Sequence, residues 1–251
     1  MRLAVLQCPS PAGDIDAACA AIKAALRAAA ALAVDVLTVP EVFLPGYNHA
    51  DVPGLAIARD ASPIARLKAA CRETGCALVM GYAERSEGKV WNSAICIDGT
   101  GAEQANYRKL QLYGPREKAL YTPGTAHVTF TTNDRKAALL ICYDIEFAPH
   151  VRALAEAGVQ VIFVPTANMM PFTHVPRVTV PAMAANHGVA IAYANYCGTE
   201  GDLTYTGGSQ IIGPHGELLA LAGEGPALLI ADLPDPDPRR VSTQLADLRM
   251  V

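Results

Sequence analysis

The 251-residue sequence is poor in charged and aromatic residues, which make up 18% and 6% of it, and it contains a single Trp. Its Lys and Arg residues form no cluster and its net charge is −4, which argues against binding to nucleic acids or anionic membranes. The most apolar helical stretch, residues 15–34, carries Lys23 and Arg27, so it indicates an amphipathic surface helix and not a membrane span. No signal-peptide pattern opens the sequence, so we expect reduced thiols and a cytoplasmic protein.

The sequence also has no signature of a bound cofactor. Its seven Cys residues are an odd number without regular spacing, and Cys71 and Cys76 have no second pair that would complete a zinc site. There is no Gly-rich loop of the kind that cradles a phosphate. We therefore expect neither a metal nor an organic cofactor.

Apolar residues make up 51% of the sequence, enough for a substantial core. We expect one domain over residues 1–251, with a Pro-rich extension from about residue 234. Buried strands that alternate with helices, and hairpins at the sheet edges, predict the α/β class. The expected strands are 2–7, 34–39, 77–83, 90–97, 126–131, 137–141, 159–164, 189–195, 207–212, 217–221 and 227–233. The expected helices are 14–33, 63–74, 149–157 and 175–187, and residues 106–114 are expected to form a polar connection.

Three buried strands end in polar or reactive residues, namely Glu41, Cys142 and Asn168. Because side chains at the carboxyl ends of neighbouring strands converge on one crevice of an α/β sheet, we expect these three to lie together. Cys142 follows an apolar strand and precedes a helix, so nearby N–H groups and the helix dipole would favour its thiolate. The alternative is that Cys142 is a small buried apolar residue, as most free Cys residues are.

A Cys nucleophile needs a base and donors that hold an oxyanion. The six His residues share no pattern, and none is excluded as the base. Glu41 is a better candidate, because an apolar pocket behind Pro40 would raise its pKa toward neutrality. Lys109 is either a solvated loop residue or a buried ammonium that stabilises an oxyanion, and the segment around Glu117 is expected to be a loop. Ser209 does not fit the Gly-x-Ser-x-Gly motif of a serine hydrolase.

Three motifs in order, Pro40-Glu41, Tyr107-Arg108-Lys109 and Ile141-Cys142-Tyr143-Asp144, resemble those of the nitrilase superfamily of carbon–nitrogen hydrolases. The resemblance extends from Arg2 to about Leu233. It implies a four-layer αββα sandwich, commonly dimerised across its helical faces, so we expect a homodimer or higher homo-oligomer.

The resemblance also implies the roles of the site residues. Glu41 would be the general base, Cys142 the nucleophile and Lys109 the oxyanion stabiliser, with the backbone N–H of Tyr143 as second oxyanion donor. Glu117 matches the second glutamate, which positions the substrate and the Lys. One segment departs from the pattern, because Met183 and Asn186 stand where relatives carry an Arg and a Glu, which puts the usual dimer packing in doubt.

The Cys-Tyr-Asp motif at Cys142 is similar to that of the bacterial aliphatic and stereoselective amidases. This branch implies hydrolysis of small aliphatic or amino-acid-type amides, through a thioester on Cys142. The same site acting on N-carbamoyl compounds, ω-amides or nitriles is an alternative, as is a scaffold protein without activity. Residues that follow strand ends and are expected to line the substrate pocket are Tyr47, Tyr113, Asn168, Met169 and Met170.

Overall fold

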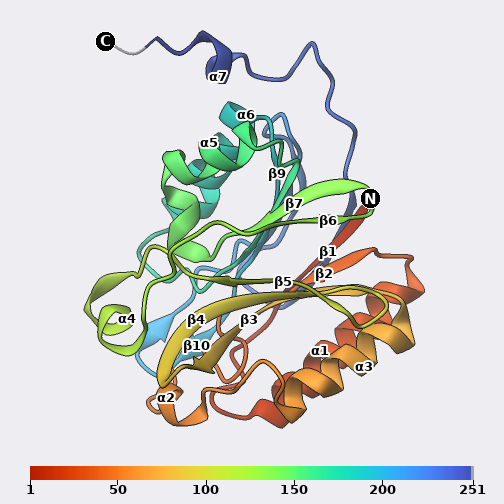
Figure 1. Cartoon of the computed structure of the whole chain (residues 1–251). Coiled ribbons are helices and arrows are strands. Elements are labelled where there is room, and N and C mark those ends of the chain that lie inside the picture. The colour runs from red at the N-terminus through yellow and green to blue at the C-terminus, as the bar shows by residue number, and fades with distance from the viewer. Residues whose placement is uncertain (250–251) are drawn as a thin grey trace.

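The computed structural model describes residues 1–249 and contains two six-stranded sheets that pack face to face, with helices on both outer faces (Figure 1). The strands of the first sheet, in spatial order, are β14 (Ala227–Asp232), β1 (Arg2–Gln7), β2 (Val36–Thr38), β3 (Ala77–Ser86), β4 (Lys89–Ile97) and β5 (Glu103–Arg108). Those of the second sheet are β13 (Leu218–Leu221), β12 (Gln210–Ile212), β9 (Ala190–Ala194), β8 (Val161–Pro165), β7 (Arg135–Leu139) and β6 (Thr129–Thr132).

The two sheets are built on the same plan. In the first, β1, β2 and β3 are parallel, and in the second, β7, β8 and β9 are parallel. The remaining strands of each sheet pair antiparallel at its edges. Helices α1 (Ile15–Ala31) and α3 (Ser62–Thr74) cover the first sheet, and α5 (Ala148–Glu156) and α6 (Val180–His187) cover the second (Figure 1). The expected αββα sandwich is therefore confirmed.

Local sequence explains where the main elements begin, end and pack. Along β1, Leu3 and Val5 belong to the core between the sheets, whereas Ala4 packs with α1 in the outer core. This burial on both faces is typical of parallel strands that lie between layers. The Asp14 side chain caps α1 by accepting a 2.8 Å hydrogen bond from the N–H of Ala17. Gly75, at φ 69°, ends α3 in the left-handed conformation that glycine adopts without strain.

Three local expectations were wrong or incomplete. Residues 106–108, expected to begin a polar connection, instead belong to β5 at the edge of the first sheet, because the outer side chains of β5 face solvent and weaken its apolar signal. Glu117 lies in a short helix, α4 (Gly114–Leu120), and not in a loop. The helix expected at 175–187 begins as a π-helical turn, Val175–Thr179, and continues as α6.

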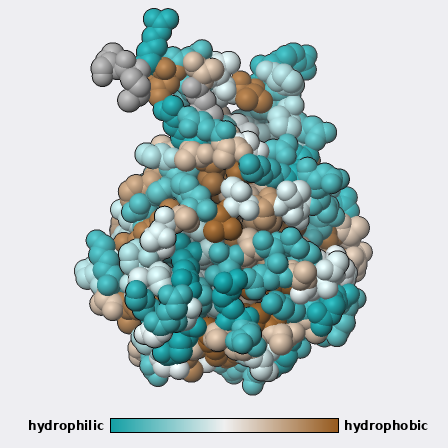
Figure 2. Space-filling model, in the orientation of Figure 1, coloured by the Kyte–Doolittle hydropathy of each residue, from teal (hydrophilic) through white to brown (hydrophobic). Residues whose placement is uncertain are grey.

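The remaining elements are small. They are α2 (Val52–Leu55), α7 (Gln244–Asp247) and a two-stranded ribbon of β10 (Thr199–Glu200) and β11 (Leu203–Thr204). After β14 the chain leaves the sandwich and runs to the outside of α6 (Figure 1), where Gln244 donates a 3.3 Å hydrogen bond to the Asn186 side chain. Figure 2 shows that hydrophilic residues dominate this face and that apolar ones lie in small separate spots. Within residues 1–249 no helix has the length and apolar character to cross a membrane.

Candidate active site

The predicted catalytic side chains come from both sheets and meet between them. Glu41 follows β2 and Lys109 follows β5 in the first sheet, whereas Cys142 follows β7 in the second. Glu117 comes from α4. The expectation that strand ends of a single sheet would form the crevice was therefore wrong: the site lies where the ends of two facing sheets come together.

Glu41, Lys109 and Glu117 form one buried ionic group, and each is at most 1% exposed. The ammonium of Lys109 lies 2.6 Å from Oε1 of Glu41 and 2.8 Å from Oε1 of Glu117. Tyr47 donates a 2.7 Å hydrogen bond to Oε1 of Glu117, and the N–H of Tyr113 donates a 2.8 Å bond to its Oε2. Glu117 is thus held by three donors, and its position beside Lys109 is as the family resemblance implies.

Glu41 is held less completely. Asn92 donates a 2.7 Å hydrogen bond to the same Oε1 that Lys109 contacts, and Oε2 is buried without a partner among residues 1–249. The hydroxyl of Tyr196 donates a 2.8 Å bond to the Glu41 carbonyl and so fixes the backbone. Gly81 of β3 allows the backbone of Glu41 and Val42 to pass close to this strand, because a Cβ at position 81 would lie 2.4 Å from the backbone N of Val42. Glu41 therefore keeps one carboxylate oxygen for a proton or a substrate.

The electrostatics of the group follow from one ammonium between two carboxylates. Burial, opposed by Lys109, raises the pKa of Glu41 to about 7. Burial alone would lower the pKa of Lys109, but Glu117 and Glu41 together raise it well above its usual value. Lys109 is therefore a permanent cation, whereas Glu41 is able to take up and release a proton near neutral pH.

Cys142 opens a short 3₁₀ turn, Cys142–Glu146, and has a φ of 45°. A left-handed backbone is rare for Cys and typical of strained functional positions. Burial, and then the charge of Glu41, raise the pKa of the Cys142 thiol more than Lys109 lowers it. The expectation that the turn would favour a thiolate was therefore wrong for the resting protein, because removal from water outweighs the nearby donors and the ammonium.

Asp144 holds this turn in place, a role that the sequence reasoning missed. Its buried carboxylate accepts hydrogen bonds from the Tyr107 hydroxyl at 2.7 Å, from the N–H of Gln111 at 2.7 Å and from the N–H of Ile141 at 3.1 Å. Gln111 follows Lys109 in the same loop, so Asp144 ties the nucleophile to the ammonium. An acidic residue two positions after the Cys, among apolar residues, was the available signal.

A cavity of about 240 Å³ opens above Cys142. Tyr47, Tyr113, Asn168 and Met169 line it, as the sequence analysis expected. The lining also includes Tyr143, Glu146, Phe172 and His174, which were not predicted as pocket residues. Of the six His residues, all within the described chain, only His174 lines this cavity, and it is exposed at the rim. Among residues 1–249 no three His, Cys, Asp or Glu side chains are grouped so that they could hold a metal ion.

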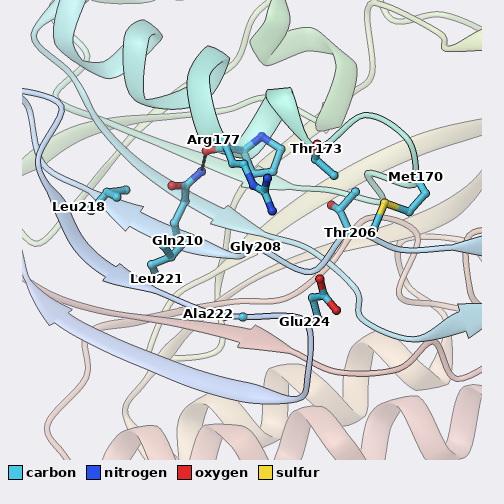
Figure 3. A pocket seen from close by; sticks show the side chains of 12 residues that line it. Met170, Thr173, Arg177, Thr206, Gly208, Gln210, Leu218, Leu221, Ala222 and Glu224 are labelled. Atoms are coloured by element: carbon cyan, nitrogen blue, oxygen red, sulfur yellow. Dashed lines mark hydrogen bonds between the residues drawn. The ribbon is translucent and has the colours of Figure 1, made fainter.

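Met170 does not line this cavity, contrary to expectation. It is 44% exposed and contributes to a separate groove together with Arg177, Gln210 and Glu224 (Figure 3). It also lines a pocket that adjoins the cavity and shares Tyr47 and Tyr113 with it. Met169 forms a bridge with Tyr205 and is buried, whereas Met170 begins a turn and its side chain is exposed. Arg177 lies in this second groove and does not line the cavity above Cys142.

Comparison with known proteins agrees with this geometry. The carbon–nitrogen hydrolase family matches residues 2–240. The hydrolase of the pqqF 5′ region of Pseudomonas protegens is 40% identical over 238 residues, which cover 93% of this chain and 82% of that protein. The (R)-stereoselective amidase of a Pseudomonas species is 33% identical over 205 residues, which cover 79% of this chain and 73% of that protein.

The chain is also similar to solved structures of amidases. An amidase from Nesterenkonia sp. matches with a TM-score of 0.91 and 36% identity over 99% of this chain and 93% of that one. A Cys-to-Ala mutant of the Nesterenkonia sp. AN1 amidase, in complex with butyramide, matches with a TM-score of 0.88 and 36% identity over 93% and 91% of the two chains. The chain therefore belongs to the carbon–nitrogen hydrolase family of the nitrilase superfamily and is an amidase that acts on bonds other than peptide bonds.

Proposed function

We propose that this protein hydrolyses small aliphatic or amino-acid-type amides to the carboxylic acid and ammonia, through a thioester on Cys142. The buried group of Glu41, Lys109 and Glu117 beside Cys142 carries the proposal, because it supplies a titratable base and a fixed cation at one thiol. The cavity of about 240 Å³ fits a small acyl group. Butyramide, bound by the Nesterenkonia amidase mutant, is a substrate-sized amide of this kind.

In the acylation step, Glu41 takes the proton of the Cys142 thiol while the sulfur attacks the amide carbon. The carbonyl oxygen becomes an oxyanion, which Lys109 and the N–H of Tyr143 stabilise. The first N–H groups of a 3₁₀ turn have no acceptor within the turn, so the N–H of Tyr143 is suited to this role. Glu41 then gives its proton to the leaving nitrogen, the C–N bond breaks, and ammonia leaves a thioester behind.

In the deacylation step, Glu41 takes a proton from water, and the hydroxide adds to the thioester carbon. The same two donors hold the second oxyanion. The C–S bond breaks, the acid leaves, and the proton returns from Glu41 to the sulfur. Glu117 touches no reacting atom in this sequence of steps, and its part is to hold the Lys109 ammonium in place through the 2.8 Å ion pair.

The pH dependence of kcat/KM tests the assignment of the base. Glu41 must be ionised to accept a proton, so activity rises with pH through about 7, the value to which burial raises its pKa. Well below that pH, kcat/KM falls by about tenfold per unit. Asn92→Leu removes a hydrogen bond that favours the ionised carboxylate, so we expect the acid limb to move to higher pH.

Asn106→Leu is the matched control, since Asn106 lies on the neighbouring strand β5 and donates to Glu84 instead of Glu41. Its acid limb should coincide with that of the wild type. An acid limb near the ordinary pKa of Glu, or one that Asn92→Leu leaves in place, would contradict the role of Glu41 as general base.

The substrate class is tested by ammonia release from propionamide, a branched amide, a glutamine-type ω-amide, an N-carbamoyl amino acid and a matched nitrile. We expect turnover of the simple amides. Turnover of only the nitrile or only the carbamoyl compound would overturn the proposal in favour of the activities named for relatives such as the Pyrococcus abyssi nitrilase and the Solanum tuberosum N-carbamoylputrescine amidase. No turnover of any of the five would favour a scaffold without activity.

A further inference from the structure

Glu146 is the one carboxylate that lines the cavity wall above Cys142 within the described chain. Glu146 ends the five-residue 3₁₀ turn that Cys142 begins, so the backbone of this turn sets the position of Glu146 relative to Cys142. The cavity surface around it is mainly aromatic and apolar, formed by Tyr47, Tyr113, Phe172 and Met169. If the reacting carbon of an amide lies at Cys142, a charged group in this wall would be available to the acyl group of that amide.

The Glu146 carboxylate has no partner of its own. It is half-buried, and within residues 1–249 it forms neither a hydrogen bond nor an ion pair, unlike the carboxylates of Glu117 and Asp144. Burial raises the pKa of Glu146, and His174 at the rim of the cavity opposes this shift. A charge that is partly removed from water without a partner is costly, so a cation that entered the cavity would be stabilised there.

Apart from His174 at the rim, no basic side chain within residues 1–249 lines the cavity to receive an anionic substrate. Arg116 donates hydrogen bonds to the carbonyls of Tyr47 and His49 at 2.9 and 3.0 Å, and it lines an adjoining pocket and not the cavity itself. Arg177 lines the separate groove of Figure 3. Lys109 is buried between its two carboxylates. A substrate with a carboxylate on its acyl group would therefore meet Glu146 with only the imidazole of His174, at the exposed rim, as a basic group in the cavity wall.

We propose that Glu146 is a specificity-determining residue that selects amides whose acyl group carries a protonated amine, such as amino-acid amides. This inference rests on the proposed function and names its substrate class more narrowly. The ammonium would pair with Glu146, and the surrounding aromatic rings add favourable contacts to a cation. Amides that carry a carboxylate would be poor substrates, because they would bring a second negative charge to the same wall.

Pairs of isosteric amides test this selectivity. β-Alaninamide has the size and shape of butyramide, and alaninamide has those of isobutyramide. In each pair the first amide carries an ammonium group where the second carries a methyl group. Succinamate serves as the anionic probe. We expect the wild type to prefer the cationic member of each pair. In Glu146→Gln the ratio of kcat/KM for β-alaninamide to that for butyramide should fall by about 10- to 100-fold, mainly through KM, as for a lost charged contact.

Glu73→Gln is the matched control, because Glu73 is exposed on α3, at the opposite side of the first sheet. The Glu73→Gln variant should keep the wild-type ratio of kcat/KM for β-alaninamide to that for butyramide. Measurable butyramide turnover by Glu146→Gln shows that the variant is folded, so an unchanged ratio there would overturn this inference and leave the proposed function intact. Preference of the wild type for succinamate would also overturn it. If the wild type hydrolyses none of these amides, the proposed function itself fails.

Discussion

Replacing Cys142 by Ala should reduce ammonia release by at least about 10⁴-fold, because no other group in the site can form the thioester. The other catalytic side chains stay in place, so the variant keeps Lys109 and Glu41 but lacks the sulfur atom that attacks the amide carbon. The measurement is steady-state ammonia release from the best amide of the panel, followed by intact-mass analysis during turnover. Wild type should show the added mass of an acyl group, and Cys142→Ala should not.

Cys8→Ala is the control for this experiment. Cys8 is a half-buried thiol outside the catalytic group, and burial raises its pKa to about 12, so it is not a nucleophile at neutral pH. This variant should keep wild-type activity and still form the acyl adduct. If Cys8→Ala lost activity as Cys142→Ala does, or if Cys142→Ala kept it, the assignment of the nucleophile would be wrong.

Replacing Lys109 by Met should both abolish activity and lower the free energy of unfolding by about 3–5 kcal/mol. The activity is lost because the oxyanion loses its charged donor. The stability is lost because Glu41 and Glu117, both fully buried, would then share a site with no cation between them. Chemical denaturation with the far-ultraviolet circular dichroism signal measures the second effect independently of the first.

A second substitution separates the two effects. In Lys109→Met combined with Glu117→Gln, one of the two uncompensated carboxylates is neutral, so we expect a large part of the lost stability to return. The activity should stay absent, since the ammonium is still missing. Arg152→Met, which breaks an exposed ion pair with Glu156 on α5, is the surface control and should change the free energy of unfolding by less than about 1 kcal/mol. Equal stability of the single and double variants would show that Lys109 and Glu117 are not electrostatically coupled.

The site as a whole separates two tasks that both need negative charge. The carboxylates of Glu41 and Glu117 are paired with Lys109, and we propose that Glu41 transfers protons while Glu117 holds the cation. The carboxylate of Glu146 lies in the cavity wall without a partner, where it is available to a substrate. This division explains how one small site could discriminate among acyl groups without altering its reactive centre.

Several features followed from the sequence because they depend on neighbours along the chain. The apolar runs of β1 and β8, the cap of α1 at Asp14 and the αL residue Gly75 depend on local propensity and periodicity. The family was recognisable because its three motifs each follow a buried strand. Elements with mixed polarity, such as β5 and α4, were missed, because only packing against the rest of the fold reveals which of their side chains are buried.

What the sequence determined by itself was the fold class, the family and the order of Glu41, Lys109 and Cys142, since each is encoded in short segments with a regular pattern. Only the tertiary structure decided that these residues come from two facing sheets, that burial raises the pKa of the Cys142 thiol, and that Met170 and Arg177 do not line the cavity that Glu146 lines. The physical reason is that burial, distance and charge pairing arise between residues far apart in the chain, and these three quantities set both the pKa values and the cavity.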